Sequence, residues 1–288
     1  MPADFVTILA RITLCSSPAR LIAGLLCGFL LVTVVPSKSS AQTKPEEVVF
    51  SGGGRELYGF LWKPEGVGPF PAILWNHGSE KWPGSQPVLA KFYTEHSYVF
   101  FIPHRRGQGR SPGQYIQDLT EQAPPNERAQ RMVELQQAEV DDVVAALDFL
   151  KSRPFVDSKR IAVSGCSYGG IQTLLIGERD LGVKALVPFA PGAMSWRNNA
   201  LLQDRLLRAV DLARVPIFLI QAENDFDLAP SKALSKEAAK KSKDFQSKIY
   251  PAFGSSHQEG HGKFCSMATD VWGNDVLAFL EAHMKSGH

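Results

Sequence analysis

A serine between glycines is the first residue in this chain whose type and setting could do chemistry. In the stretch GCSYGG, Ser167 follows the apolar run 161–164 and precedes a helix-compatible segment. Gly165 and Gly169 remove the side chains that would collide if a serine were held on a sharp strand-to-helix turn. A hydroxyl presented there can act as a nucleophile, because the N-terminus of a helix favours negative charge. The alternative is a glycine-rich turn whose serine only caps the helix.

A serine nucleophile needs a base, and four histidines follow it in the chain. His283 and His288 belong to the closing helix and the C-terminus, where we expect them to face solvent. His257 and His261 share the loop after the last strand. His261 is the preferred base, because it and the glycine after it lead toward the closing helix, and His257 stays open as the alternative. Their His-x-x-x-His spacing lacks a helical frame and a nearby third ligand, so no metal site is predicted.

The base in turn needs a carboxylate that orients it, and one segment offers three. The apolar run 216–221 leads into AENDFDLAP. Asp225 follows that run by the few residues that a loop needs to return a carboxylate to the sheet edge, so Asp225 is the predicted acid. Glu223 and Asp227 are weaker candidates. Asp227 is better placed to cap the helix that opens at Pro230.

Acyl transfer also requires backbone N–H donors for the oxyanion. One expected donor is the amide of Tyr168, which directly follows the serine. The second is expected from the turn NHGSE after the strand at 72–75, where a glycine allows close backbone approach. We assign that role to the amide of Ser79. His77, in the same turn, is better explained by packing than by catalysis.

Short apolar runs and amphipathic segments alternate along the chain. Over 132–151 the apolar residues recur every three or four positions, which predicts a helix. The apolar runs predict buried parallel strands covered by helices on both faces, and a glycine-turned hairpin over 47–62 adds antiparallel strands at the N-terminal side. Reactive groups gather at the carboxyl ends of such strands. The other strands are expected at 72–75, 98–103, 161–164, 184–189, 216–221 and 247–250, and the other helices at 87–96, 171–179, 201–212, 230–243 and 269–284.

These motifs resemble those of α/β-hydrolases, and within that fold the dienelactone hydrolase and prolyl oligopeptidase-type group. The matching stretches, spread over 47–284 in the order of the family, are WNHGSE, PHRRGQGRSPG, GCSYGG, QAENDFDLAP and IYPAFGSSHQEGHG. The resemblance implies an α/β-hydrolase fold, a catalytic triad of Ser167, Asp225 and His261, and no cofactor.

The chain departs from this group in three ways that bear on its activity. The strand before the acid ends in Gln221-Ala222, where the group usually has His-Gly or a similar pair. Dienelactone hydrolases proper use a cysteine nucleophile, whereas here Cys166 precedes the serine, so lactone hydrolysis is not implied. The related oligopeptidases carry an N-terminal propeller that screens substrates, and none is expected here. An open site favours small esters over peptides.

The sequence therefore predicts a serine hydrolase that cleaves carboxylic esters of small molecules through an acyl-enzyme. One alternative is a serine peptidase of the prolyl oligopeptidase type without a propeller. Another is a hydrolase-fold binding protein without catalytic activity. The arginines 105, 106 and 110 follow a strand end, where they could contact an acidic substrate, although a solvated arginine or a salt bridge that tethers the loop is the commoner outcome. The segment around 114–138 is a possible lid.

Composition and the N-terminus point to an exported globular protein. The 288 residues are 44% hydrophobic and 21% charged, which suits one large α/β domain, expected over 42–288. The uncharged apolar run 21–35 is shorter than the roughly 20 residues that span a bilayer, and small residues at 39 and 41 suit a signal peptidase. Residues 1–41 are therefore predicted to be a cleaved export signal, with an uncleaved membrane anchor as the less favoured alternative. We expect a periplasmic or extracellular protein that is not inserted in a membrane.

Removal of that signal leaves a formally neutral chain with no basic stripe, so nucleic acid is not an expected partner. The expected partner is a small-molecule ester, and the oligomeric state stays open. Cys166 and Cys265 remain in a compartment that permits disulfides. Whether they pair stays open as well, because a sequence does not give the distance between two sulfur atoms.

Overall fold

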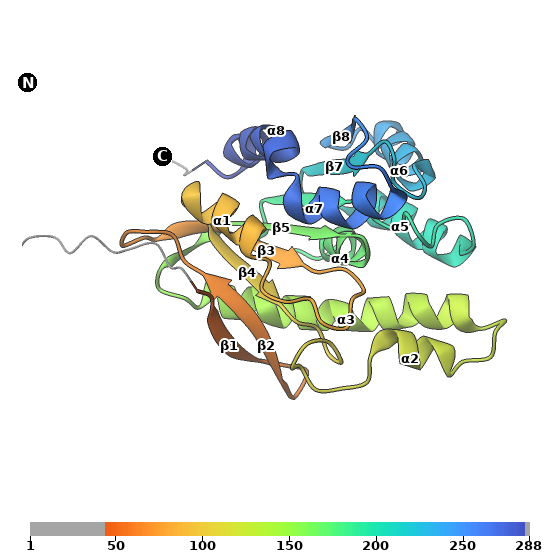
Figure 1. The fold of residues 1–288 in the computed structure, drawn as a ribbon, viewed down its shortest axis with the longest axis horizontal. Coiled ribbons are helices and arrows are strands. Elements are labelled where there is room, and N and C mark those ends of the chain that lie inside the picture. Colours follow the sequence, from red (N-terminus) through yellow and green to blue (C-terminus); the bar gives the residue numbers. More distant parts are fainter. Residues whose placement is uncertain (1–43, 286–288) are drawn as a thin grey trace, which may run out of the picture. The chain divides into compact units, whose positions relative to one another are not determined.

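A single mixed sheet of eight strands forms the centre of the protein (Figure 1). The computed structural model describes residues 44–285, which belong to one compact unit, and the predicted export signal lies outside them. The strands are β1 (Glu46–Gly52), β2 (Arg55–Trp62), β3 (Phe70–Asn76), β4 (Val99–Pro103), β5 (Val156–Cys166), β6 (Ala185–Phe189), β7 (Ile217–Ala222) and β8 (Phe245–Tyr250). The helices are α1 (Pro87–Glu95), α2 (Ile116–Glu121), α3 (Arg128–Lys151), α4 (Tyr168–Ile176), α5 (Ala200–Leu212), α6 (Ala229–Lys240), a π-helix (Glu259–Lys263), α7 (Phe264–Met267) and α8 (Thr269–His283).

The strand order is β1-β2-β4-β3-β5-β6-β7-β8. The pairs β1–β2 and β2–β4 are antiparallel, and every pair from β4 to β8 is parallel. This confirms the predicted α/β-hydrolase fold, with its mostly parallel sheet and its antiparallel N-terminal hairpin.

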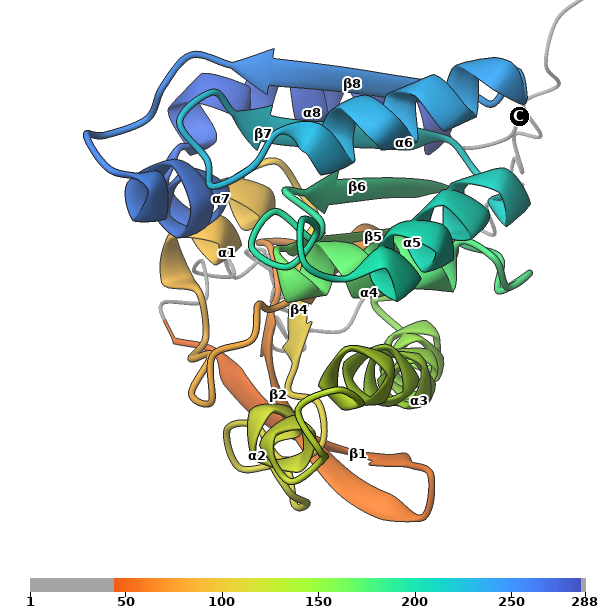
Figure 2. The ribbon, with the colours of Figure 1, turned by 90° about the vertical axis from the view of Figure 1, so that its right-hand side faces the viewer.

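Helices cover both faces of the sheet (Figure 2). Successive residues of a strand point to opposite faces, so β3, which is apolar up to Trp75, fills two cores. Leu74 belongs to the cluster that packs under α3, α4, α5 and α6. Ile73 and Trp75 belong to the cluster under α1, α7 and α8. Burial on both sides explains why these strands lack the polar alternation of a sheet with one wet face.

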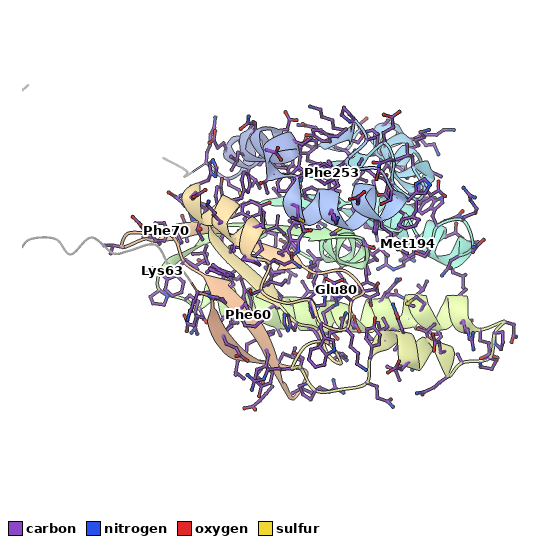
Figure 3. The ribbon with its side chains drawn as sticks, in the orientation of Figure 1. Phe60, Lys63, Phe70, Glu80, Met194 and Phe253 are labelled. Carbon is purple, nitrogen blue, oxygen red and sulfur yellow. A yellow bond between two sulfur atoms is a disulfide. The ribbon has the colours of Figure 1, made fainter. Side chains whose placement is uncertain are left out.

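The register of the parallel strands brings the chemically interesting turns together. Asn76, the last residue of β3, lies opposite Gly165 near the end of β5. The turn after β3 therefore adjoins the turn that carries Ser167. Loops after β6, β7 and β8 emerge at the same edge, because all these strands run in the same direction. Among the side chains in Figure 3, Glu80 follows β3 and Met194 follows β6, and both line a pocket at this edge.

Some elements differ from the sequence prediction. Helix α3 starts at Arg128 rather than 132, because its first turn is too polar to show an apolar period. Helix α2 and the π-helix were not predicted, since short helices carry too few residues to establish a period. Both fall in segments that matter for the site: α2 lies within the proposed lid segment 114–138, which stays a prediction, and the π-helix carries a candidate base. No helix in the described part of the chain is long and apolar enough to cross a membrane.

Candidate active site

Ser167 stands on a strained turn between β5 and α4. Its backbone angles are φ 57° and ψ −115°, a region that costs a non-glycine residue about 1–3 kcal/mol. The turn is held by a hydrogen bond from its N–H to the Phe189 carbonyl, at 2.9 Å. A Cβ at Gly165 would come within 2.6 Å of the Asn76 carbonyl oxygen, so only glycine allows β3 and this turn to approach so closely. The Ser167 side chain makes no capping hydrogen bond, which argues against a serine that only caps α4.

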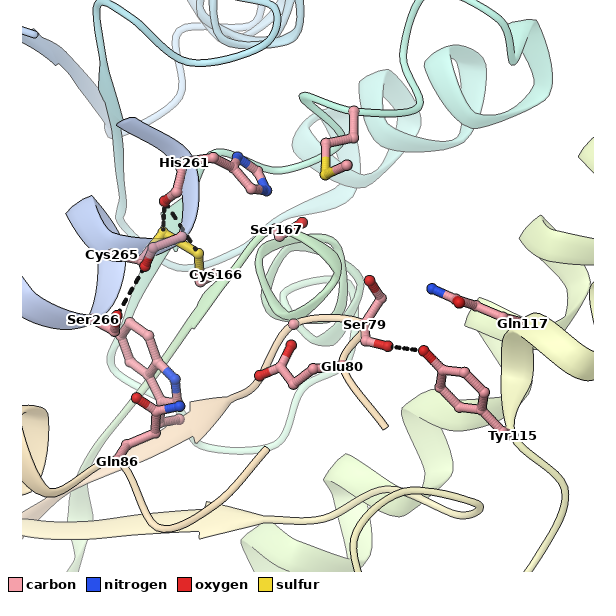
Figure 4. Close-up of a pocket in the computed structure, with 14 residues that line it drawn as sticks. Ser79, Glu80, Gln86, Tyr115, Gln117, Cys166, Ser167, His261, Cys265 and Ser266 are labelled. Atoms are coloured by element: carbon pink, nitrogen blue, oxygen red, sulfur yellow. Dashed lines mark hydrogen bonds between the residues drawn. A yellow bond between two sulfur atoms is a disulfide. The ribbon is translucent and has the colours of Figure 1, made fainter. Parts of the chain in front are cut away.

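A histidine and an aspartate meet beside this serine. His261 Nδ1 lies 2.8 Å from Oδ1 of Asp225, and both side chains are buried. The other ring nitrogen, Nε2, is buried and has no hydrogen-bond partner in the described part of the chain. His261 and Ser167 line the same pocket, where Figure 4 shows the imidazole beside the serine. The ring is therefore held at one nitrogen, and its other nitrogen is left without a partner among the described residues.

Gln221 holds the aspartate from the other side, a role that sequence reasoning missed. Its Nε2 donates to Oδ2 of Asp225 and to the Asp227 carbonyl, both at 2.9 Å, while its Oε1 accepts from Ser231. With the Phe226 N–H on Oδ1 at 2.6 Å, both carboxylate oxygens of Asp225 are fixed. The departure from the His-Gly pattern at this strand end was the available signal. The glutamine orients the acid.

The weaker candidates lie elsewhere. His257 is exposed, and its Nδ1 contacts the Asn224 carbonyl oxygen at 2.9 Å. Asp227 Oδ1 accepts from the N–H of Ala229, the first residue of α6, at 2.9 Å. Neither residue lines the pockets around the serine. The structure thus brings His261 and Asp225 to the serine, and it places Asp227 at the helix start.

The two expected oxyanion donors also flank the serine. Ser79 and Tyr168 both line a pocket together with Ser167. Within residues 44–285, neither backbone N–H donates to a protein acceptor. Two N–H groups left open beside a hydroxyl can bind a negatively charged oxygen.

The three arginines after β4 are each paired with a carboxylate of the protein and not left open for an acidic substrate. The Arg105 side chain is 1% exposed and pairs with Glu139, with Nε 3.1 Å from Oε2. Arg106 pairs with the buried Asp142, and Arg110 pairs with Glu47. The loop-tethering alternative is therefore the correct one.

Burial shifts the titration of the groups around Arg105. Burial, with the nearby Arg105 charge second, holds the pKa of His77 well below its usual value. Burial raises the pKa of Glu139, although Arg105 opposes the shift. Burial and the neighbouring Glu139 also keep the pKa of Tyr168 well above its usual value, so this phenol keeps its proton as a donor. His77 is a neutral packing histidine, as the sequence suggested.

Cys166 and Cys265 form a disulfide, which answers the question that the sequence left open. The bond joins the residue before Ser167 to α7. The two sulfur atoms contact the His261 carbonyl oxygen, at 3.9 Å from Cys166 and 3.0 Å from Cys265 (Figure 4). The disulfide thus links the turn of the serine to the segment of the histidine.

Two pockets meet at Ser167, and Ser79 also lines both. The first, which we call the histidine pocket, has about 360 Å³ and includes His261, Glu80 and Ser266. The second, which we call the apolar pocket, has about 200 Å³ and includes Ile116, Met132 and Ile171. The described residues contain no group of three side chains placed to hold a metal ion. The arrangement brings the predicted nucleophile, base, acid and oxyanion donors to the same two cavities.

Comparison with known proteins gives a consistent result. The model of the dienelactone hydrolase family matches residues 88–284. Dipeptidyl-peptidase 5 of Porphyromonas gingivalis is 26% identical over 202 residues, which cover 58% of this chain but only 27% of that protein. The chain therefore spans about a quarter of this curated relative.

Two solved structures share the fold at low sequence identity. An acylaminoacyl peptidase of Pyrococcus horikoshii superposes with a TM-score of 0.63 at 18% identity, covering 85% of this chain and 42% of that one. An esterase of Pyrococcus furiosus gives a TM-score of 0.60 at 16% identity, covering 85% and 92%. The same fold thus occurs in a peptidase and in an esterase.

Proposed function

The chain belongs to the dienelactone hydrolase family of α/β-hydrolases, and we propose that it is a serine hydrolase that cleaves small carboxylic esters through an acyl-enzyme. The observation that carries this proposal is the setting of His261. Its Nδ1 is bonded to a buried carboxylate, and its Nε2 is unpartnered beside the Ser167 pocket. A histidine fixed at one nitrogen and open at the other suits a general base for a serine hydroxyl.

The proposed reaction follows from these positions. Ser167 Oγ attacks the ester carbonyl while His261 Nε2 takes its proton, and Asp225 holds the imidazole and stabilises its positive charge. The N–H groups of Ser79 and Tyr168 bind the oxyanion. The C–O bond of the ester then breaks as His261 returns the proton to the alcohol. Water then attacks the acyl-enzyme through the same steps, with His261 as its base, and the carboxylic acid is released.

The two pockets support an assignment of the two halves of the ester. The alcohol must leave next to the base, and the histidine pocket contains His261 whereas the apolar pocket does not. The apolar pocket, lined by Ile116 and Ile171, would then receive the acyl group. Its volume of about 200 Å³ suits a short acyl chain. This fit favours small esters over extended peptides.

A peptidase is the second candidate, because the relatives include a dipeptidyl-peptidase and an acylaminoacyl peptidase. The two proposals differ in the leaving group alone. A matched pair of substrates, with one short acyl group on p-nitrophenol and on p-nitroaniline, separates them. We expect the ester to be preferred by a margin well beyond their difference in intrinsic reactivity. A larger kcat/KM on aminoacyl amides than on short esters would favour the peptidase.

A fluorophosphonate probe tests the serine itself. We expect stoichiometric labelling of wild type and none of Ser167→Ala, with Ser266→Ala, which alters another serine of the histidine pocket, as the labelled control. An unlabelled wild type would point to a binding protein without catalysis. We also propose that the enzyme is exported, and N-terminal sequencing of the secreted protein should find cleavage near residue 41.

A further inference from the structure

Five successive carbonyl groups after β3 are bonded to the loop after β4. The carbonyl oxygens of residues 77–81 each accept a hydrogen bond from a residue between 105 and 115. In the order of the acceptors, the donors are Arg105 Nη1 (3.0 Å), Arg105 Nη2 (2.7 Å), the Tyr115 hydroxyl, Gln108 Nε2 (2.8 Å) and the Gly109 N–H (2.7 Å). A loop held at every carbonyl has little freedom to rotate its peptide groups.

We propose that Arg105 is a positioning residue for the reaction, because it holds the Ser79 N–H in the direction that binds the oxyanion. The inference rests on the proposed serine hydrolase function. It assigns to the arginine a role in catalysis without contact with substrate, since its side chain is 1% exposed.

The bond from Arg105 to the Gly78 carbonyl acts on the peptide unit that contains the Ser79 N–H. A trans peptide is planar, and its C=O and N–H point in opposite directions. A guanidinium that fixes the Gly78 oxygen at 2.7 Å therefore aims the Ser79 N–H away from itself, and Ser79 lines a pocket together with Ser167. A charged donor also strengthens the bond and polarises the peptide, which makes its N–H a better donor.

Arg105 is also connected to the residue of the second oxyanion donor. Its Nε donates to Oε2 of Glu139 at 3.1 Å, and the same oxygen accepts from the Tyr168 hydroxyl at 2.8 Å. The guanidinium carbon lies 4.7 Å from the centroid of the Tyr168 ring. One buried side chain thus contacts both the peptide unit that contains the Ser79 N–H and the ring of Tyr168.

The chemistry of arginine explains why a lysine would not serve here. The guanidinium is a rigid planar fork with donors in fixed directions, and it bonds two carbonyls and a carboxylate at once. A lysine ammonium carries one nitrogen and cannot reach all three acceptors. The charge is kept in Arg105→Lys, but the Gly78 oxygen loses its shortest and only charged hydrogen bond. It keeps its contacts with His77 Nδ1 at 2.9 Å and Gln108 Nε2 at 3.5 Å.

The neighbouring arginine supplies a matched control. Arg106 forms its own pair with the buried Asp142, through Nε and the backbone N–H to Oδ2 at 2.8 and 2.9 Å. It donates no hydrogen bond to residues 77–81 within the described chain. Arg106→Lys therefore disturbs a comparable ion pair on the same loop without touching the peptide of Ser79.

The test compares both variants with wild type on a short aryl ester and with a trifluoromethyl ketone, which forms an oxyanion on the serine. We expect Arg105→Lys to lower kcat by roughly 10- to 100-fold, which is less than the loss when an oxyanion donor is deleted. The affinity for the ketone should fall by a similar factor, whereas KM should change little. Arg106→Lys should keep kcat and ketone affinity near wild type, even if its thermal midpoint falls equally. Arg105→Met should lower kcat and the ketone affinity more than Arg105→Lys does.

Each other outcome decides against the inference. Equal losses of kcat in the Arg105 and Arg106 variants would show a general effect of loop stability and would overturn the inference. A raised KM with an unchanged kcat in Arg105→Lys would also overturn it. If Arg105→Met does not fold, Arg105→Lys decides by the same criteria. A wild type that neither reacts with a fluorophosphonate nor hydrolyses an ester or amide would overturn the proposed function, and this inference with it. A labelled, active wild type with an unaffected Arg105→Lys overturns this inference alone.

Discussion

Cys166 and Cys265 are joined across 99 positions of the sequence, so that the residue before Ser167 is covalently tied to α7. His261 lies four residues before Cys265, and its carbonyl oxygen contacts both sulfur atoms. The serine and the histidine come from distant parts of the chain, after β5 and after β8. The disulfide limits how far these two segments can move apart.

Removing the disulfide should destabilise the protein. Replacing both cysteines with serine is expected to lower the free energy of unfolding by about 2–5 kcal/mol, because the unfolded chain is freed from a long closed loop. Urea unfolding with and without reductant measures this. Reductant should lower the wild-type midpoint toward that of the double variant and leave the variant unchanged. The test uses the chain from residue 42 on, whose only cysteines are Cys166 and Cys265, and two free thiols in it when denatured and unreduced would refute the pairing.

The two histidines of one loop should behave differently on substitution. His261→Ala is expected to lower kcat by 10⁴-fold or more, on the order of the loss when a triad member is removed. His257→Ala should stay close to wild type, because its ring contacts the Asn224 carbonyl and lines neither pocket. Ester hydrolysis under saturating substrate is the measurement. The reverse ranking would make His257 the base.

The two aspartates of the loop after β7 form a second pair of variants. Asp225→Asn should lower kcat by about 10⁴-fold, because an amide no longer stabilises the imidazolium or fixes its tautomer. Asp227→Ala should keep kcat and instead cost about 0.5–2 kcal/mol of stability, since its carboxylate accepts the first N–H of α6. Kinetics and thermal unfolding of both variants separate the roles. A kcat loss confined to Asp227→Ala would move the acid there.

Glu80 should give the site a preference for positive charge. It is the one Asp, Glu, Lys or Arg among the residues that line the histidine pocket. A choline ester should be favoured over the neutral 3,3-dimethylbutyl ester of the same shape by a few-fold, as expected from about 0.2–1 kcal/mol for an exposed ion pair. The preference should shrink in salt and vanish in Glu80→Gln, but persist in Glu95→Gln on α1. A preference that survives Glu80→Gln would exclude this carboxylate.

Glu259 should stabilise the histidine segment down to strongly acidic pH. The backbone N–H of Ser255, and then Lys263, hold the pKa of Glu259 at about 2, below its usual value. A depressed carboxyl pKa stabilises the fold fully above the unfolded value, near 4.5, and this contribution is lost as the pH falls through about 2.

A comparison of urea midpoints against pH tests this expectation. The difference between wild type and Glu259→Gln should be constant above pH 5 and shrink toward pH 2. It should also be smaller in high salt, because Glu259 is exposed and solvent screens its charge. A difference that grows on acidification would contradict the sign.

Much of the fold followed from local pattern. Apolar runs without polar alternation required strands buried on both faces, and β3 and β7 are such strands. The turn at Ser167 was also local, since strand, glycines and helix follow one another directly. Helix α2 and the π-helix escaped prediction because a few residues carry no periodic signal.

The sequence by itself determined the order of the chemistry along the chain: a serine after one strand, a carboxylate after a later strand and histidines after the last. Only the tertiary structure decided which histidine meets Asp225, that Cys166 pairs with Cys265, and that Arg105 is buried against the Gly78 carbonyl. Local pattern depends on neighbours in sequence. These contacts depend on strand order and side-chain packing between segments far apart in the chain, and a sequence does not contain those distances.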